Sequence, residues 1–161
     1  MRIKGLLVFL LGIALATVAT AQTKTSGKTT CKGEPGSPVV LGDKPNHSFA
    51  IGKAACTWTG MEVAGLQPKD GVSTDLDEMT GDATSYHGYH IATMTNGDTW
   101  VARYQGTGKL KDGKPVSGHG TWSFTSGTGK LKGIKGKGTY KGTANPDGTV
   151  TYDVEGEYQL P

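Results

Sequence analysis

Residues 84–105, TSYHGYHIATMTNGDTWVARYQ, carry the pattern that decides the fold. Aromatic and β-branched residues flank Asn96-Gly97, a dipeptide that tolerates the positive φ angles of a two-residue type I′ turn. The stretch therefore predicts a β-hairpin centred on Asn96-Gly97. A two-residue turn also sets the register, which is expected to pair Thr93 with Trp100, Ile91 with Ala102, His90 with Arg103 and Tyr89 with Tyr104.

That register gives the hairpin two substantially apolar faces, because successive side chains of a strand point to opposite sides. One face is expected to carry His87, Tyr89, Ile91, Trp100 and Tyr104. The other is expected to carry Tyr86, His90, Ala92, Met94, Val101 and Arg103. We expect both faces to be covered, one by a core or pocket and the other by further protein. The pattern does not label which face points inward.

The C-terminal segment predicts a second hairpin. Val150, Tyr152, Val154, Gly156 and Tyr158 alternate with polar residues, which indicates a strand with one buried and one wet face. A turn over 145–148, Asn-Pro-Asp-Gly, connects it to a strand over 133–142. Further strands are expected at 48–52, 55–64 and 117–125. Seven or eight strands in one small domain predict an all-β, antiparallel closed barrel, because closure removes exposed edges.

Glycine accounts for 24 of the 140 residues that follow residue 21, once Gly5 and Gly12 are subtracted from the total of 26. The glycines of 133–138 cannot all be turns. Glycine at strand spacing lets a backbone or an aromatic ring approach closely and permits the sharp coiling of a small barrel.

The N-terminus predicts export. Arg2 and Lys4 precede an apolar run over 6–15, and Ala19-Thr20-Ala21 supplies the small residues of a cleavage site. The run is shorter than the roughly 20 residues that span a bilayer, so residues 1–21 are expected to be a signal peptide rather than a stable membrane anchor. The mature protein is then secreted or periplasmic, with a loose arm over 22–37 and one barrel domain over 38–161.

Cys31 and Cys56 are expected to form a disulfide, because two cysteines of one small exported domain most simply pair. Such a bridge contributes about 3 kcal/mol by the loop-entropy estimate. Two separate thiols are the alternative.

The charge of the chain does not indicate nucleic-acid binding. The whole chain has 17 basic and 14 acidic residues, and removal of Arg2 and Lys4 leaves 15 and 14, a net charge of +1. Eight lysines and one acid, Asp112, lie between Lys109 and Lys141. Solvated strand faces explain this distribution, and a polyanion-binding face is the alternative.

Several chemical motifs are excluded. No window fits a phosphate-binding loop, and no Gly-x-Ser-x-Gly elbow exposes a nucleophile. His87 and His90 would point to opposite faces of a strand, so no metal site is expected there. The run 75–78 is expected to be a solvated acidic turn rather than a calcium loop. We expect neither a metal nor a cofactor.

The segment 122–140 resembles a recurring element of the allene oxide cyclase and dirigent barrels, in its Gly127-Thr128-Gly129, Leu131 and Gly136. The wider stretch 86–160 resembles small secreted bacterial proteins of unassigned function. The resemblance implies an eight-stranded antiparallel barrel with an apolar interior, often assembled as a trimer. It carries no active site over, because the matching motif is a structural turn.

The candidate binding residues come from the hairpin. His87, Tyr89, Trp100 and Tyr104 would offer aromatic walls to a small ligand, whereas His90 beside Arg103 would act as a neutral base or hydrogen-bond partner. Simple core packing is the alternative for these aromatics. The leading hypothesis is a secreted, non-catalytic barrel that binds a small apolar or aromatic molecule. An isomerase or cyclase using the same cavity, and an envelope protein with a polyanion-binding lysine face, are the alternatives.

Overall fold

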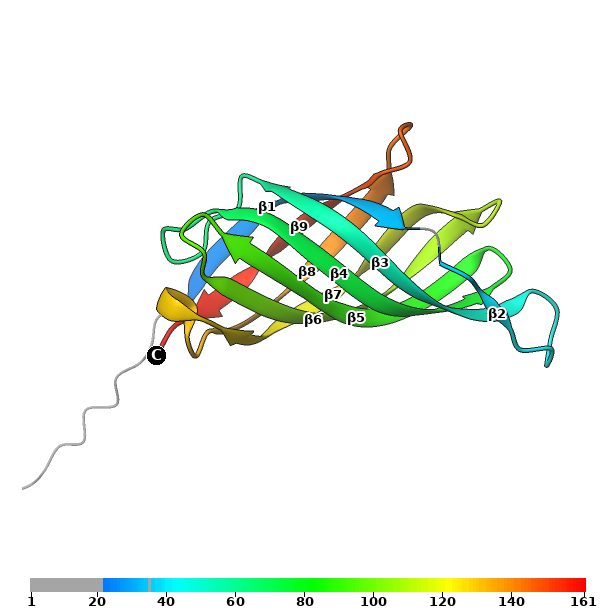
Figure 1. Cartoon of the computed structure of the whole chain (residues 1–161), viewed down its shortest axis with the longest axis horizontal. Coiled ribbons are helices and arrows are strands. Elements are labelled where there is room, and N and C mark those ends of the chain that lie inside the picture. The colour runs from blue at the N-terminus through cyan, green and yellow to red at the C-terminus, as the bar shows by residue number, and fades with distance from the viewer. Residues whose placement is uncertain (1–21, 35) are drawn as a thin grey trace, which may run out of the picture.

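Antiparallel strands make up most of the computed structural model, which describes residues 22–34 and 36–161 (Figure 1). The expected signal peptide, residues 1–21, lies outside the described residues. The elements are β1 (Thr23–Glu34), β2 (Val39–Val40), β3 (His47–Thr59), β4 (Pro68–Thr80), β5 (Ala83–Met94), β6 (Thr99–Lys111), β7 (Lys114–Gly127), the 3₁₀ helix η1 (Gly129–Leu131), β8 (Lys135–Ala144) and β9 (Val150–Gln159).

The sheet closes into a barrel. Its strand order is β1-β9-β8-β7-β6-β5-β4-β3-β2, and β1 also pairs with β3. Eight strands thus form a closed antiparallel ring, and β2 adds a short outer strand along β3. Figure 1 shows β1, in blue, alongside β9, in red, at this closure. The predicted fold class, an eight-stranded antiparallel barrel, is confirmed.

The predicted loose arm is wrong for Thr23–Glu34, which form β1 and pair with both β9 and β3. The inward positions of this strand include Thr25, Gly27, Thr29 and Cys31, which are buried or half-buried. Because these inward residues are small or polar, the strand lacks the apolar alternation that marks a half-buried strand.

The predicted acidic turn at 75–78 is also wrong, because these residues lie within β4. Asp75 and Asp77 are half-buried, while Val72 and Leu76 are exposed. The usual pattern of apolar residues inside and polar residues outside is therefore inverted along β4. The predicted strand over 55–64 ends early, since β3 stops at Thr59.

The predicted register of the central hairpin is wrong by one residue. Thr93 pairs with Thr99, Ile91 with Val101, His90 with Ala102 and Tyr89 with Arg103. The loop has three residues rather than two, since the Met94 N–H donates to the Asp98 carbonyl over 2.7 Å and Gly97 has a φ of 87°. The Asp98 carboxylate accepts hydrogen bonds from the Asn96 amide and from the backbone N–H of Lys130, which fix Asp98 at the end of the loop.

The second predicted hairpin is confirmed. β8 and β9 pair along their whole length, and the Asn145 N–H donates to the Thr149 carbonyl across the turn. On β9, Val154 and Tyr158 are buried and Asp153 and Glu155 are exposed, as the alternation predicts.

Glycines in β8 and β9 make room for an aromatic ring. A Cβ atom at Gly138 or Gly156 would lie 2.7 or 2.5 Å from the indole ring of Trp122. The expectation that strand glycines permit close approach of a ring is therefore confirmed.

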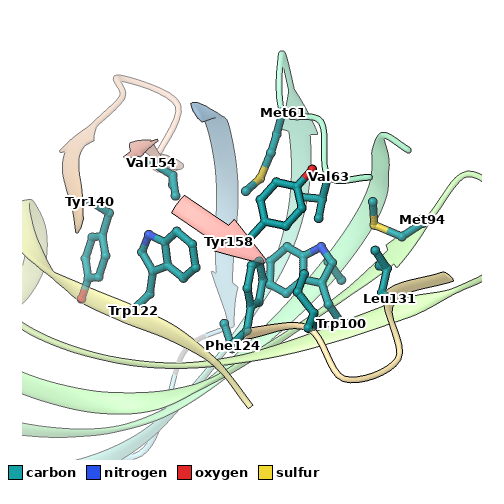
Figure 2. Close-up of a cluster of buried hydrophobic side chains, with 13 residues drawn as sticks. Met61, Val63, Met94, Trp100, Trp122, Phe124, Leu131, Tyr140, Val154 and Tyr158 are labelled. Atoms are coloured by element: carbon teal, nitrogen blue, oxygen red, sulfur yellow. The ribbon is translucent and has the colours of Figure 1, made fainter. Parts of the chain in front are cut away.

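One end of the barrel interior is filled by an apolar core (Figure 2). Trp100 packs edge-to-face on Phe124, with ring centroids 5.2 Å apart, and Trp122 packs on the same ring at 4.9 Å. The loop that follows β3 closes this end with Met61 and Val63, and η1 adds Leu131. Nothing in the described part of the chain is a helix long and apolar enough to cross a membrane.

The predicted disulfide is confirmed. Cys31 of β1 and Cys56 of β3 lie directly opposite one another, with an S–S distance of 2.04 Å. The bond therefore crosses the seam at which the barrel closes. A disulfide is typical of proteins that fold in an oxidising compartment.

Candidate ligand-binding interior

The second half of the barrel interior, toward the end at which β2 lies, is lined by polar and aromatic side chains. Its inward positions alternate with exposed ones along β4, β5 and β6, and they are only partly shielded from solvent. We call this region the polar interior, and define it by Asp75, Asp77, Thr84, Tyr86, Tyr104, Tyr140 and Tyr152.

Four tyrosines form a continuous chain of edge-to-face contacts across the polar interior. The ring centroids are 6.3 Å apart from Tyr86 to Tyr104, 6.3 Å from Tyr104 to Tyr140 and 5.8 Å from Tyr140 to Tyr152. These residues come from β5, β6, β8 and β9. The chain therefore spans the barrel and presents both ring faces and hydroxyl groups to the interior.

Glycines on several strands create the space for these rings. A Cβ atom at Gly118 would lie 2.7 Å from the Tyr86 hydroxyl, and one at Gly142 would collide with the Tyr152 ring. Cβ atoms at Gly106 and Gly120 would both collide with the Tyr140 hydroxyl. The glycine-rich composition of these strands thus has a structural cause in the polar interior as well as in the apolar core.

Two carboxylates lie beside the tyrosines. The Tyr104 hydroxyl donates a hydrogen bond of 2.7 Å to Asp75 Oδ2. Asp77 is two residues further along β4 and so points to the same side. Both carboxylates extend over Gly52 of β3, where a Cβ atom would collide with Asp75 and lie 3.1 Å from Asp77 Oδ2.

The two carboxylates influence each other. Burial and, to a smaller extent, the negative charge of Asp75 together raise the pKa of Asp77 to about 6, although the neighbouring Thr84 hydroxyl opposes the shift. The Asp77 carboxyl therefore changes protonation state near neutral pH, far above the range of a solvated aspartate.

The tyrosine hydroxyls are neutral and not fully used. Burial raises the pKa of Tyr86, Tyr104, Tyr140 and Tyr152 above the usual tyrosine value. The buried hydroxyls of Tyr86 and Tyr140 are near enough to affect each other's pKa, yet neither has a partner with hydrogen-bond geometry. If one of these hydroxyls donated a hydrogen bond to the other, the second proton would still be unused, so at least one donor remains for a ligand.

His90 lies between the polar interior and the apolar core. Its Nε2 accepts a hydrogen bond of 3.2 Å from the Trp58 indole, and its Nδ1 lies 2.8 Å from Ser73 Oγ. Burial lowers the pKa of His90 to about 4, so the ring is neutral. Because Nε2 is the acceptor, the proton is on Nδ1 and is donated to Ser73. The predicted pairing of His90 with Arg103 is wrong, because Ala102 lies opposite His90.

The structure divides the six predicted site residues into two groups. Trp100, Tyr104 and His90 point into the barrel, where Trp100 belongs to the apolar core and Tyr104 to the polar interior. His87, Tyr89 and Arg103 point outward and are exposed. This division follows from the one-residue register shift of β6, which moves Trp100 and Tyr104 to the face of His90. Ligand binding by any of the six stays a prediction.

The outward group lies on an open surface. Arg103 borders a shallow groove on the outer wall that also includes Lys137 and Glu155. Arg103 and His87 also border a second shallow depression with His119. Trp100 lines neither depression, so neither brings these residues together with it.

Sequence reasoning missed Asp75, Asp77, Tyr140 and Tyr152 as site residues. The signal that could have identified the first two is the alternation of Val72 and Leu76 with Ser73, Asp75 and Asp77, read with the polar residues inside. In the described part of the chain, no three histidine, cysteine, aspartate or glutamate side chains are grouped to hold a metal ion. His87 and His90 point to opposite faces of β5, as expected.

The lysine-rich segment does not form an isolated positive face. Lys137 and Lys141 of β8 lie opposite Glu157 and Asp153 of β9. Lys28 of β1 also contacts Asp153 in an exposed ion pair. Basic and acidic residues therefore alternate across neighbouring strands on this side of the barrel.

Comparisons with known proteins show the fold and not the chemistry. The chain matches no family model and has no significant match among the curated proteins. A conserved protein of unknown function from Rhodopseudomonas palustris shares the fold with a TM-score of 0.55 and 15% identity, over 88% of this chain and 99% of that chain. A protein of unknown function of the DUF3224 family from Shewanella oneidensis gives 0.52 and 16%, over 88% and 100%. The pterocarpan synthase dirigent protein GePTS1 gives a TM-score of 0.48 and 12% identity, over 96% of this chain and 100% of that chain.

Proposed function

We propose that the mature domain is an exported binding protein that holds a small aromatic molecule in the polar interior of the barrel. The observation that carries this proposal is the chain of four tyrosines, whose rings line the interior and whose hydroxyls are partly unused. Hydrogen-bonding groups that a protein buries without partners are costly, so a ligand that satisfies them gains affinity.

The partition of the interior supports a site at this end of the barrel. The apolar half is filled by interlocking tryptophan, phenylalanine and methionine side chains, which leaves little reason to expect a ligand there. The polar half combines aromatic walls with a few polar groups, which is the usual composition of a small-molecule site. Asp75, Asp77, Tyr86 and Tyr104 all remain partly exposed, so solvent reaches them.

Export is part of the same proposal. The signal-like N-terminus predicts it, and the disulfide between Cys31 and Cys56 supports an oxidising compartment. Mass spectrometry of the protein from the exported fraction of its host should find a chain that begins at Gln22.

The test of binding is native mass spectrometry of that exported protein. We expect an adduct that leaves on denaturation. Tyr86→Ala should abolish the adduct, whereas Thr121→Ala, at an exposed position of β7, should retain it. An adduct that survives Tyr86→Ala, or wild-type protein that is always empty, would contradict the proposal.

A second candidate function is proton-transfer catalysis, such as isomerisation, in the same site. Asp77 favours it, because a carboxyl with a pKa of about 6 can accept or donate a proton near neutral pH. Turnover would then rise with pH as Asp77 loses its proton. A flat pH profile on a substrate that is turned over would exclude this role for Asp77.

We also propose that the barrel self-associates, as the expected trimer requires. Tyr89 and Ile91 on the outer face of β5 are half exposed, at 51% and 50%, and Val72 and Ile51 extend this apolar surface over β4 and β3. A second copy of the chain could cover it. Ile91→Lys should shift the native mass from oligomer to monomer, and a wild-type protein that is monomeric at high concentration would overturn the proposal.

A further inference from the structure

Asp75 and Asp77 are two negative charges inside the barrel without a positive partner. All 15 lysine and arginine side chains in the described part of the chain are exposed. The ion pairs found there involve other acids, namely Asp43, Asp70, Glu78 and Asp153. The inward-facing histidine, His90, is neutral. Charges removed from water are normally paired, so this pair calls for a partner from outside the chain.

A second, independent feature points to a ligand at the same place. Tyr140 is only 8% exposed, and its hydroxyl has no partner with hydrogen-bond geometry. Its ring contacts those of Tyr104 and Tyr152. Figure 2 shows Tyr140 at the side of the apolar cluster away from Met94 and Leu131, beyond Trp122. The ring of Tyr140 is part of the apolar cluster, whereas its unused hydroxyl lies beside that of Tyr86 in the polar interior.

The tyrosine rings lie near the carboxylates and are electrically neutral. Tyr104 hydrogen-bonds to Asp75, and the negative charge of Asp75 also raises the pKa of Tyr86 and Tyr152. The rings consequently lie within electrostatic range of the acids. The face of an aromatic ring attracts cations, and desolvation strengthens that attraction.

We propose that the ligand of the polar interior is an organic cation, an ammonium group attached to a small apolar or aromatic frame. The ammonium group would lie against Asp75 and Asp77, and the frame would pack on the tyrosine rings with a hydroxyl of Tyr86 or Tyr140 as an additional donor. The inference rests on the proposed binding function and specifies the ligand's charge. A metal ion is the less suitable occupant, because only two carboxylates are available and the remaining wall is aromatic.

The test is an NMR titration of the ¹⁵N-labelled mature protein with three probes of matched shape. These are 2-phenylethylammonium, 2-phenylethanol and phenylacetate, which carry positive, zero and negative charge. At about pH 7.5, where Asp77 is ionised, we expect the cation to bind at least tenfold more tightly than the alcohol. Phenylacetate should not bind. The amides of Gly52 and Gly88, which border the carboxylates, should shift.

The decisive variant is the double substitution Asp75→Asn and Asp77→Asn, which keeps side-chain shape and an acceptor for Tyr104. It should weaken binding of 2-phenylethylammonium at least tenfold, to the level of the alcohol. Asp112→Asn in the β6–β7 turn is the matched control, because it removes an exposed acid and asparagine tolerates the positive φ of 53°. That control should change the affinity by less than twofold. Amide dispersion in both spectra verifies folding.

The outcomes separate this inference from the proposed function. If the alcohol binds as tightly as the cation and shifts the same amides, the charge inference fails and the binding function stands. If no probe shifts these amides at millimolar concentration, both fail. If calcium chloride displaces the amine and shifts the same amides, the site is a metal site and the organic cation is wrong.

Discussion

Tyr104 of β6 donates its hydroxyl proton to Asp75 of β4 over 2.7 Å, and this bond joins the tyrosine chain to the interior carboxylates. The two residues are 29 positions apart and lie on strands separated by β5. The contact therefore runs along the inner face of the sheet, over Gly88 of β5, which pairs with both residues.

Removal of this hydroxyl should destabilise the protein. Tyr104→Phe keeps the ring and leaves Asp75 without its donor, and a hydrogen bond to a charged group contributes about 1–2 kcal/mol when it is partly exposed. Urea unfolding at neutral pH would measure the loss. Tyr89→Phe on the exposed face of β5 is the control and should change stability by less than about 0.5 kcal/mol. Equal stability of the two variants would contradict the role of the bond.

Loss of the negative charge at Asp77 should stabilise the empty protein above neutral pH. The pKa of Asp77 rises from 3.8 to about 6 on folding. The destabilisation caused by its negative charge is therefore absent below about pH 3.8 and complete above pH 6. With a discount for partial exposure, this penalty is of the order of 1–2 kcal/mol. Asp77→Asn should therefore raise the urea midpoint at about pH 7.5 and leave it nearly unchanged at about pH 4. A variant that is less stable than wild type at the higher pH would show that the charge has a partner.

Protonated His47 should stabilise the folded protein at low pH, and this stabilisation should decrease as the pH rises. Its Nδ1 lies 2.6 Å from Asp43 and its Nε2 lies 2.9 Å from Glu78, and the hydrogen bonds to Asp43 and then Glu78 raise its pKa. The contribution is fully present below the unfolded pKa of about 6.5, and it is lost as pH rises through the raised pKa of the folded state. Asp43→Asn should lower the pKa of His47, measured by NMR titration of the imidazole. An unshifted titration would contradict the coupling.

Replacement of Gly138 by alanine should cost about 1–3 kcal/mol, because the added methyl group would overlap the Glu155 carbonyl oxygen and the Trp122 ring. Gly33→Ala in β1 is the control, since a Cβ atom there would meet nothing within 4 Å. Thermal unfolding monitored by tryptophan fluorescence would compare them. A similar melting temperature for both variants would mean that the barrel accommodates the methyl group at position 138 without loss of stability.

The disulfide should contribute about 3 kcal/mol, the value expected from closing a loop with a sequence separation of 25. Cys31→Ser with Cys56→Ser should lower the free energy of unfolding by that amount in denaturant titrations. Wild-type protein under reducing conditions should match the double variant. A much smaller loss would mean that β1 is held in place by its pairing with β9 alone.

The sequence predicted the barrel class well because turn chemistry and alternation are local. Asn145-Pro146-Asp147-Gly148 located one hairpin correctly, and Asn96-Gly97 located the other. The predicted register of the second hairpin was wrong because Asp98 is held at the end of a three-residue loop by Lys130, a residue 32 positions away that no local pattern contains.

The candidate site was predicted only in part, for a related reason. Alternation divides a strand into two faces, and the usual assumption is that the apolar face is the inner one. In β4 the inner face is polar, so Asp75 and Asp77 were assigned to a solvated turn. In the hairpin, a one-residue slip moved Tyr104 from the face of Tyr89 to that of His90. Tyr104 alone of the predicted residues belongs to the polar interior.

The position of β1 between β3 and β9 has a consequence for how the chain is made. β1 is the first strand of the described chain. One of its two edges pairs with the last strand, β9, from Val150 onward. A chain that has not yet emerged to this point therefore leaves β1 and β8 as two open edges. Contacts so distant in sequence form slowly, and unpaired edges invite association with other chains. Completion of the ring must await the final ten residues of strand, while the Cys31–Cys56 pair can already hold β1 against β3.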